Sequence, residues 1–377
     1  MAHIHLLATA GNRVRLPGSA CASLIIAGLL AAVPSACQPG WFITEPSQVR
    51  ENRVDETADP GVDYWGVYFS DPAKLSSQGY RRGPDRLLSA AIYQARLSVD
   101  VAAYDLNLWS LRDALIAAHL RGVRVRTVCD SDNLDREEIQ DLAAAGIPVL
   151  GDRRAGLMHH KFVVIDRLEV WTGSMNFTLK DAYHNNNNLL RLRSVRLAED
   201  FTAEFEEMFV QDRFGPGSPA ETPHPLVQVD DTLVEVFFSP EDGIGERLIE
   251  LVNSAQESIF FLAYSFTNDS LGAAMLERAG AGLTVSGVFE TSQADASQGS
   301  EFERMIAEGL QVYLDGNPDR MHHKVIVIDR QVVVIGSYNF TDNAEEVNDE
   351  NILVLHSPQI AAQFLAEIER MLDQARK

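Results

Sequence analysis

Hydrophobic and polar positions follow one another along the chain in a rhythm of helices and strands. From Asp85 the apolar positions recur at helical spacing, and from Leu97 to Tyr104 they alternate, which predicts a helix followed by a strand. The same criteria predict, in chain order, a helix over 110–121 capped by Ser110, a strand over 123–129, a helix over 136–145, strands over 147–150, 158–166, 168–172 and 189–192, and a helix over 198–209. Such alternation is typical of an α/β sandwich with a mixed sheet.

The chain contains an internal repeat. Residues 158–166 read Met-His-His-Lys-Phe-Val-Val-Ile-Asp, and residues 321–329 read Met-His-His-Lys-Val-Ile-Val-Ile-Asp. A Gly-Ser-x-Asn-Phe-Thr phrase follows each of them, at 173–178 and at 336–341, so the second phrase keeps the same distance from the first in both copies. The repeat predicts two domains of one fold, each carrying the same set of reactive side chains.

The repeat and the irregular stretches between its copies set the expected domain boundaries. Residues 215–219 read Gly-Pro-Gly-Ser-Pro and break every regular pattern, so the junction is expected there. The distance along the chain from Tyr104 to Tyr264 is three residues shorter than the distance between the two copies of the motif. This difference predicts a three-residue insertion in the second half, in the loop 292–299. The expected segments are a signal peptide over 1–37, a linker over 38–66, a first domain over 67–214, a linker over 215–227 and a second domain over 228–377.

The first residues have the order of a targeting sequence. Arg13 and Arg15 precede an apolar run over 20–33, which is too short to span a membrane, and small residues then lead to Cys37. The chain is therefore expected to be exported, either as a lipoprotein attached to the cell envelope through a lipid on Cys37 or as a secreted protein. Cell fractionation tests this expectation, and an unprocessed chain in the cytosol would contradict it.

The composition limits the substrates. A formal net charge of −22 opposes a broad nucleic-acid surface, because duplex binding rests on many Lys and Arg side chains that meet phosphates. A phosphate group must therefore bind in a local positive pocket.

The repeated phrase supplies such a pocket. On a strand, residues i and i+2 share a face, so His159 and Lys161 are expected to project together, as are His322 and Lys324. An imidazole beside an ammonium group suits phosphorus chemistry, because one provides a nucleophile or an acid and the other a fixed positive charge. The neighbouring residues His160 and His323 point to the other face and are interpreted as structural.

Other residues of the two phrases are expected to support the site. Hydrogen bonds to phosphate oxygens are expected from Ser174, Asn176, Ser337 and Asn339. Asp166 and Asp329 close their strands and are interpreted as supporting residues that fix the backbone and the lysines. No cluster of Cys or His residues has the spacing of a metal site, so no metal and no other cofactor is expected.

These phrases resemble the HKD motifs of the phospholipase D superfamily, over roughly residues 85–375. The resemblance implies two tandem α/β/α sandwich repeats that pack about a pseudo-twofold axis, with the active site between them. It also implies His159, Lys161, Asp166, His322, Lys324 and Asp329 as catalytic residues. In that superfamily one histidine attacks phosphorus and forms a phosphohistidine, while the other protonates the leaving alcohol and then activates water.

One position distinguishes the two halves. Glu350 follows His322 at the same distance along the chain at which Asn187 follows His159, so a carboxylate in the second half matches an amide in the first. A carboxylate beside His322 should raise the pKa of that histidine and suit it to an acid role, whereas His159 beside a neutral amide should be the nucleophile.

The resemblance leaves the substrate open. The acidity and the targeting sequence favour hydrolysis of phospholipids to phosphatidic acid and a headgroup alcohol, by a monomer. The alternatives are an endonuclease of the same superfamily that cleaves DNA or RNA, for which nucleic acid would be the substrate, and phosphatidyl transfer of the cardiolipin type. A binding scaffold without activity is disfavoured, because both halves retain every residue of the motif.

Overall fold

The computed structural model describes residues 63–75, 79–80 and 82–377, which all belong to one compact unit, Glu56–Lys377. The expected signal peptide and nearly all of the expected linker 38–66 lie outside the described residues. Within the described part of the chain, no helix is long and apolar enough to cross a membrane.

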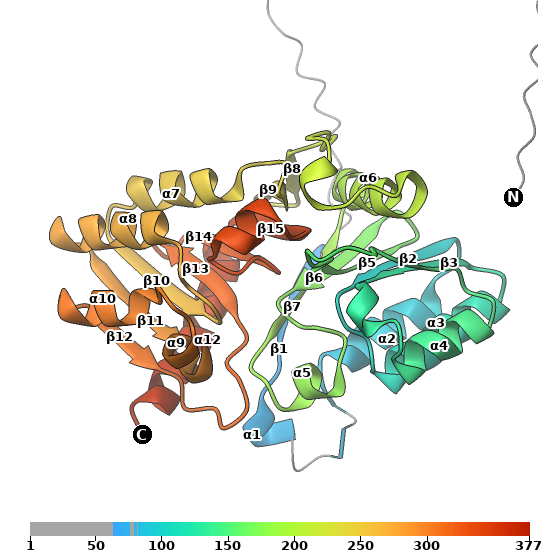
Figure 1. Ribbon diagram of the computed structural model, residues 1–377, viewed down its shortest axis with the longest axis horizontal. Coiled ribbons are helices and arrows are strands. Elements are labelled where there is room, and N and C mark those ends of the chain that lie inside the picture. Colours follow the sequence, from blue (N-terminus) through green and yellow to red (C-terminus); the bar gives the residue numbers. More distant parts are fainter. Residues whose placement is uncertain (1–62, 76–78, 81) are drawn as a thin grey trace, which may run out of the picture. The chain divides into compact units, whose positions relative to one another are not determined.

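The described chain forms two mixed β-sheets of the same design (Figure 1). The first sheet has the order β1-β7-β6-β5-β2-β3-β4, and the second has the order β12-β11-β10-β13-β14-β15-β9-β8. In each sheet three successive strands pair in parallel, β2-β3-β4 and β10-β11-β12, and the other pairs are antiparallel. The strands are β1 Trp65–Phe69, β2 Ser98–Ala103, β3 Arg124–Cys129, β4 Val149–Gly151, β5 Lys161–Ile165, β6 Glu169–Gly173, β7 Asn188–Arg193, β8 Leu226–Val229, β9 Thr232–Ser239, β10 Ser258–Ala263, β11 Thr284–Phe289, β12 Gln311–Leu314, β13 Lys324–Ile328, β14 Val332–Gly336 and β15 Glu350–His356.

Helices cover both faces of each sheet. The helices are α1 Pro72–Leu75, α2 Asp85–Gln94, α3 Trp109–Leu120, α4 Glu137–Ala144, α5 Leu179–Tyr183, α6 Val195–Gln211, α7 Ile244–Ser254, α8 Asp269–Gly280, α9 Thr291–Ala296, α10 Glu301–Ala307, α11 Asp342–Glu346 and α12 Pro358–Ala375, with short 3₁₀ turns at Ser131–Asn133 and Gly215–Gly217. In Figure 1 the helices α2, α3 and α4 lie on one side of the first sheet, and α7, α8 and α10 on the outer side of the second.

The two halves share a central hydrophobic core. Apolar side chains of the long helices α6 and α12 pack there with side chains from both sheets. The central strand β5 is apolar at successive positions because both of its faces are buried. Phe162 and Val164 enter the shared core, whereas Val163 and Ile165 enter the separate core under α2, α3 and α4. Strand β13 divides its side chains between the shared core and the core under α7, α8 and α10 in the same way. The α/β fold with two sandwich repeats is therefore as expected.

Most of the predicted elements match the structure, but the strand predicted over 158–166 is shorter, Lys161–Ile165, and the short helices α1 and α5 were not predicted. Helix α3 begins at Trp109, and its N-cap residue Leu108 makes no side-chain cap, so the prediction that Ser110 caps the helix is wrong. The Ser110 hydroxyl instead donates to Asp85, 2.6 Å away. The terminal strand β1, which pairs antiparallel with β7, was not predicted, because its short run of residues follows a long polar stretch.

The three-residue insertion is confirmed. The distance along the chain from β3 to β11 equals the distance from Tyr104 to Tyr264. The distance from β5 to β13 equals the distance between the two motifs, which is three residues longer. The extra residues lie between β11 and α10, where α9 forms. The expected domain boundaries stay predictions; β1 spans the one at 66–67, and β8 spans the one at 227–228.

Candidate active site

The two repeated phrases meet where the halves contact each other. The backbone N–H of His159 donates to the carbonyl of Asp349 at 3.0 Å, and that of His322 donates to the carbonyl of Asn186 at 2.8 Å. The two donors are equivalent residues of the two repeats, and so are the two acceptors. The contacts are therefore reciprocal, as a pseudo-twofold relation requires. Each motif histidine is thereby fixed by the loop of the opposite half.

In each motif, the histidine and the lysine both lie close to the ring of one tyrosine. The ring of Tyr104 lies 4.9 Å from that of His159 and 5.1 Å from the ammonium nitrogen of Lys161. The ring of Tyr264 lies 4.5 Å from both the His322 ring and the Lys324 ammonium nitrogen. The expected pairing of His and Lys is therefore confirmed, although each histidine precedes its strand and only the lysine opens it.

The Nδ1 atoms of the two histidines have different partners. His159 Nδ1 lies 2.7 Å from Glu350 Oε2, whereas His322 Nδ1 lies 3.0 Å from Asn187 Oδ1 and 3.1 Å from the carbonyl of Ser174. Each of these partners comes from the other half. The prediction that Glu350 stands beside His322 and Asn187 beside His159 is wrong. It assumed that residues of one repeat meet within one half, but strands β15 and β7 begin at the interface and direct these side chains across it.

Burial controls the charges in the site. Burial, reinforced by Lys161, lowers the pKa of His159 well below its ordinary value, and burial, reinforced by Lys324, does the same for His322. Burial also lowers the pKa of Lys161 to about 7 and that of Lys324 well below its usual range, and raises the pKa of Glu350 to about 7. Both imidazoles are therefore neutral at pH 7, and a phosphodiester anion between the lysines would favour the charged forms of the basic groups.

The second histidine of each motif contacts a long helix of the shared core. His160 is fully buried, and its Nε2 lies 2.8 Å from Glu204 on α6. His323 is equally buried, and its Nε2 lies 2.9 Å from Glu367 on α12. These contacts tie the two motifs to the long helices of the shared core.

The two serines lie at the site and hold the Nδ1 partners of the histidines. Ser174 donates from its hydroxyl to Asn187 Oδ1 at 3.0 Å, and Ser337 bonds the carboxylate of Glu350. Asn176 donates to Asp181 at 3.2 Å. The carbonyl oxygens of the Asn176 and Asn339 side chains are buried without a partner among the described residues.

Sequence reasoning missed a carboxylate beside His322. Asp181 on α5 is 5% exposed, and its Oδ1 lies 3.4 Å from His322 Nδ1. It also accepts a hydrogen bond from Asn187 Nδ2 at 3.0 Å. The equivalent position of the second repeat is Ala344, and this difference between the repeats was the signal that could have revealed Asp181.

Asp166 and Asp329 lie apart from the histidines. Each follows the last residue of its central strand, so about 16 Å of strand separates it from the lysine that opens the strand. The Asp166 carboxylate accepts the backbone N–H groups of residues 96–98, and the Asp329 carboxylate those of residues 256–258. The structure thus places both aspartates where they fix the backbone and neither where it contacts the motif lysine.

Asp166→Ala is therefore expected to affect stability more than chemistry. It removes three backbone hydrogen bonds to one carboxylate, which should lower the free energy of unfolding by roughly 2 to 3 kcal/mol. Urea unfolding and turnover of the folded fraction measure the two effects separately. A folded variant with normal stability and greatly reduced turnover would show that this interpretation is wrong.

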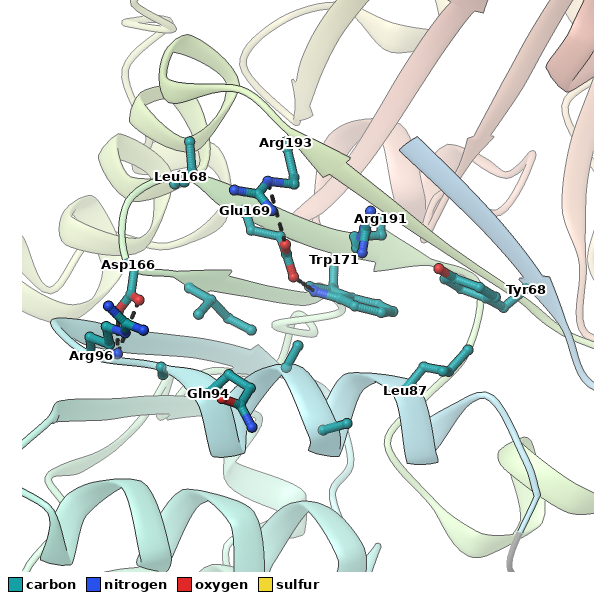
Figure 2. A pocket seen from close by; sticks show the side chains of 14 residues that line it. Tyr68, Leu87, Gln94, Arg96, Asp166, Leu168, Glu169, Trp171, Arg191 and Arg193 are labelled. Carbon is teal, nitrogen blue, oxygen red and sulfur yellow. Dashed lines mark hydrogen bonds and ion pairs between the residues drawn. The ribbon is translucent and has the colours of Figure 1, made fainter. Parts of the chain in front are cut away.

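A large surface pocket lies away from these groups. Figure 2 shows it between α2 and the strands β5, β6 and β7. The volume of the pocket is about 540 Å³. Trp171, which stacks on Tyr68 at 5.6 Å, forms part of its wall, and Trp171 Nε1 donates to Glu169 at 2.7 Å. None of the motif histidines or lysines lines this pocket, so it is not the place of the chemistry.

Among the described residues, no group of three or more His, Cys, Asp or Glu side chains is arranged to hold a metal ion. The site instead offers two neutral imidazoles, two lysines and buried amides around them. This arrangement fits nucleophilic and acid-base attack on an anionic phosphorus centre.

The fold and this pair of motifs define a phospholipase D-like protein. The sequence model of the family described as "Cardiolipin synthase, PLD-like domain" matches residues 88–209 and 248–372, about two thirds of the chain. The chain therefore belongs to this family, within the phospholipase D superfamily.

Individual relatives agree with this assignment. The human mitochondrial cardiolipin hydrolase is 36% identical over 126 residues, which are 33% of this chain and 50% of that protein. A phospholipase D of Rickettsia bellii is 28% identical over 152 residues, 39% of this chain and 75% of that protein. The chain spans about half the length of the cardiolipin hydrolases it matches.

The phosphatidylserine synthase of Haemophilus influenzae has the same fold. Its crystal structure covers 78% of this chain and 84% of its own, with a TM-score of 0.58 and 14% sequence identity. The match spans both repeats and thus supports the arrangement of two sandwich domains in one chain.

Proposed function

We propose that the protein is a phospholipase D-type phosphodiesterase that hydrolyses phospholipids to phosphatidic acid and a free headgroup alcohol. The observation that carries the proposal is the convergence of His159 and His322 from opposite halves, each with its Nδ1 atom engaged and a lysine beside it. With Nδ1 held as the donor, the lone pair of a neutral imidazole is at Nε2, where it can attack phosphorus or exchange a proton.

The sequence-based reason for assigning His159 as the nucleophile, a neutral amide beside it, is wrong, because its Nδ1 partner is Glu350. The same assignment is proposed on a different ground, the contact with that carboxylate. The bound phosphodiester anion favours the imidazolium form of His322, which carries a proton on Nε2 as well as on Nδ1. Attack by His159 Nε2 forms a P–N bond and breaks the bond from phosphorus to the headgroup oxygen, which takes the Nε2 proton of His322 and leaves that ring neutral. The phosphorylated imidazole ring gains positive charge, and the carboxylate at Nδ1 stabilises that charge. The amide at His322 Nδ1 leaves that ring free to change its protonation state, as an acid and then a base must do.

The second half of the reaction restores the enzyme. Water attacks phosphorus and gives a proton to His322, while the P–N bond breaks and its electron pair returns to His159 Nε2. The charge that gathers on the phosphoryl oxygens in both steps is met by the ammonium groups of Lys161 and Lys324. Two displacements replace one difficult direct attack by water.

Phospholipid is favoured over nucleic acid on two grounds. The chain carries a net charge of −22, which opposes the many phosphate contacts of a nucleic-acid groove. The relatives with the names phospholipase D and cardiolipin hydrolase act on lipids by name. Export to the cell envelope, attached through Cys37 or secreted, is part of the same proposal and would bring the enzyme to membrane lipids.

A primary alcohol is expected to divert the reaction. Because the second step exchanges water for another nucleophile, adding ethanol or butanol to a phosphatidylcholine assay should convert part of the phosphatidic acid into a phosphatidyl alcohol. Mass spectrometry of the extracted lipids measures both products. A protein that releases no phosphatidic acid from any phospholipid but cleaves single-stranded or duplex DNA would establish the nuclease alternative instead.

A further inference from the structure

The two catalytic histidines have unequal access to a carboxylate. His159 contacts Glu350 directly at 2.7 Å. His322 contacts the neutral amide of Asn187, and the nearest carboxylate, that of Asp181, lies 3.4 Å from its Nδ1 atom. Each histidine therefore has one acidic group, but the two groups come from different positions of the repeat.

The sequence shows that the carboxylates have exchanged positions. Where the first half has Asp181 and Asn187, the second half has Ala344 and Glu350 at the equivalent positions. Each half thus has one carboxylate at these two positions, aimed at the histidine of the other half. As a result, the carboxylate contacts His159 directly, whereas at His322 an amide lies between the carboxylate and the ring.

The surroundings of Asp181 hold its carboxylate in this place. Its Oδ1 atom accepts from Asn187 Nδ2 at 3.0 Å and from Asn185 Nδ2 at 3.1 Å. Its Oδ2 atom accepts from Thr178 Oγ1 at 2.7 Å and from Asn176 Nδ2 at 3.2 Å. Four side-chain donors converge on one buried group, an arrangement that suits an acceptor-only carboxylate.

Asn187 connects this carboxylate with the histidine. Its NH₂ group donates to Asp181, which leaves its carbonyl oxygen directed at His322 Nδ1. The amide orientation is therefore fixed by Asp181, and a fixed acceptor at Nδ1 keeps the proton there and Nε2 available for acid-base exchange.

We propose that Asp181 is a positioning residue for His322: through Asn187 it orients the imidazole and favours the protonated form that gives its proton to the leaving alcohol. This inference rests on the proposed function, because it assigns a role within that reaction. The other charged or titratable groups that face His322 are Lys324, Lys161, His159, Arg320 and Tyr264, and the cations among them oppose protonation. The Asp181 carboxylate, 3.4 Å from His322 Nδ1, is placed to oppose their effect.

The first test is the variant Asp181→Asn. Loss of the carboxylate should lower the pKa of His322, which ¹⁵N NMR of histidine-labelled protein measures without any substrate, with the His322 signals assigned from a His322→Gln sample. Turnover of a diester with an alkyl leaving group should fall by roughly 10²-fold, because such a leaving group needs general acid catalysis. A p-nitrophenyl leaving group needs no proton, so its release should fall much less.

The pH profile distinguishes this role from a purely structural one. His322 must be protonated to act as the acid, so a lower pKa shifts the alkaline limb of kcat to lower pH in Asp181→Asn. Asp200→Asn is the matched control, since Asp200 is fully buried on α6, accepts a hydrogen bond from the backbone of His224 and lies outside the site. Its pH profile should equal that of the wild type.

The decisive variant is Asp181→Ala/Asn187→Glu, which gives the first half the residues of the second. The donors that the second half uses around Glu350 are Ser337 and Asn348, and the first half already has their counterparts Ser174 and Asn185. The double variant should recover the His322 pKa and the alkaline limb that Asp181→Asn loses.

Two results would overturn the inference. One is an unchanged His322 pKa and pH profile in Asp181→Asn; the other is a double variant that folds but keeps the pH profile of the single one. A wild-type protein that hydrolyses no phosphodiester would instead refute the proposed function, while the NMR titration would still decide whether Asp181 controls the pKa of His322.

Discussion

His159→Ala is expected to abolish both turnover and the covalent intermediate, with a loss of at least about 10⁴-fold, the size typical for removal of a catalytic nucleophile. His322→Ala should lose turnover of natural phospholipid as well, because the alcohol then leaves without a proton. With bis(p-nitrophenyl) phosphate, however, His322→Ala should still form the adduct on His159, since p-nitrophenol departs unaided. The adduct should accumulate, because no base remains to activate water.

Mass spectrometry of protein quenched in alkaline denaturant locates the adduct on the peptide that contains residue 159 or on the one that contains residue 322. His160→Gln serves as a control for the loss of a neighbouring buried histidine, because His160 contacts Glu204 on α6. An adduct on His322 in the His159→Ala protein, with none on His159 in the His322→Ala protein, would reverse the assignment and leave a two-histidine mechanism in place.

Glu350→Gln is expected to reduce kcat by roughly 10³- to 10⁴-fold while the protein remains folded, by analogy with removal of the carboxylate that orients a catalytic histidine. The Gln amide can direct its NH₂ group at His159 Nδ1, which favours the tautomer with its proton on Nε2 and removes the nucleophilic lone pair. It also removes the charge that stabilises the phosphorylated ring.

Glu204→Gln is the matched control, because Glu204 is a buried glutamate that contacts His160 and not His159. It should change thermal stability and leave kcat of the folded protein near the wild-type value. If Glu350→Gln and Glu204→Gln had equal, small effects on kcat, the contact between Glu350 and His159 would have no part in catalysis.

The fold and the participants of the site were largely predictable from the sequence. The two copies of the motif gave the repeat, and the comparisons confirm both the superfamily and the sandwich architecture. The side-by-side placement of His159 and Lys161 also agrees with the structure, because residues two positions apart at the start of a strand lie on one side of the sheet.

The partners of the histidines were not predictable, because they depend on how the halves pack. Spacing along one repeat placed Glu350 beside His322, whereas the actual contact joins it to His159. The buried polar run at 185–188 belongs to the same interface: Asn187 and Asn188 contact His322 and His323 across it. Local periodicity contains no information on such pairings, and Asp181, on the short helix α5, has no motif of its own.

The crossed contacts between the halves have a consequence for how this gene can change. Because the Nδ1 partner of each histidine comes from the opposite repeat, a mutation near residue 187 or 350 affects a histidine that the other half of the gene encodes. Loss of either repeat would remove the Nδ1 partner of the remaining histidine, so residues 159 and 350, and residues 322 and 187, form pairs that depend on both halves. Because the two repeats belong to one chain, their sequences can differ. Two identical subunits would have to place the same residue beside both histidines, whereas this chain gives one a carboxylate and the other an amide.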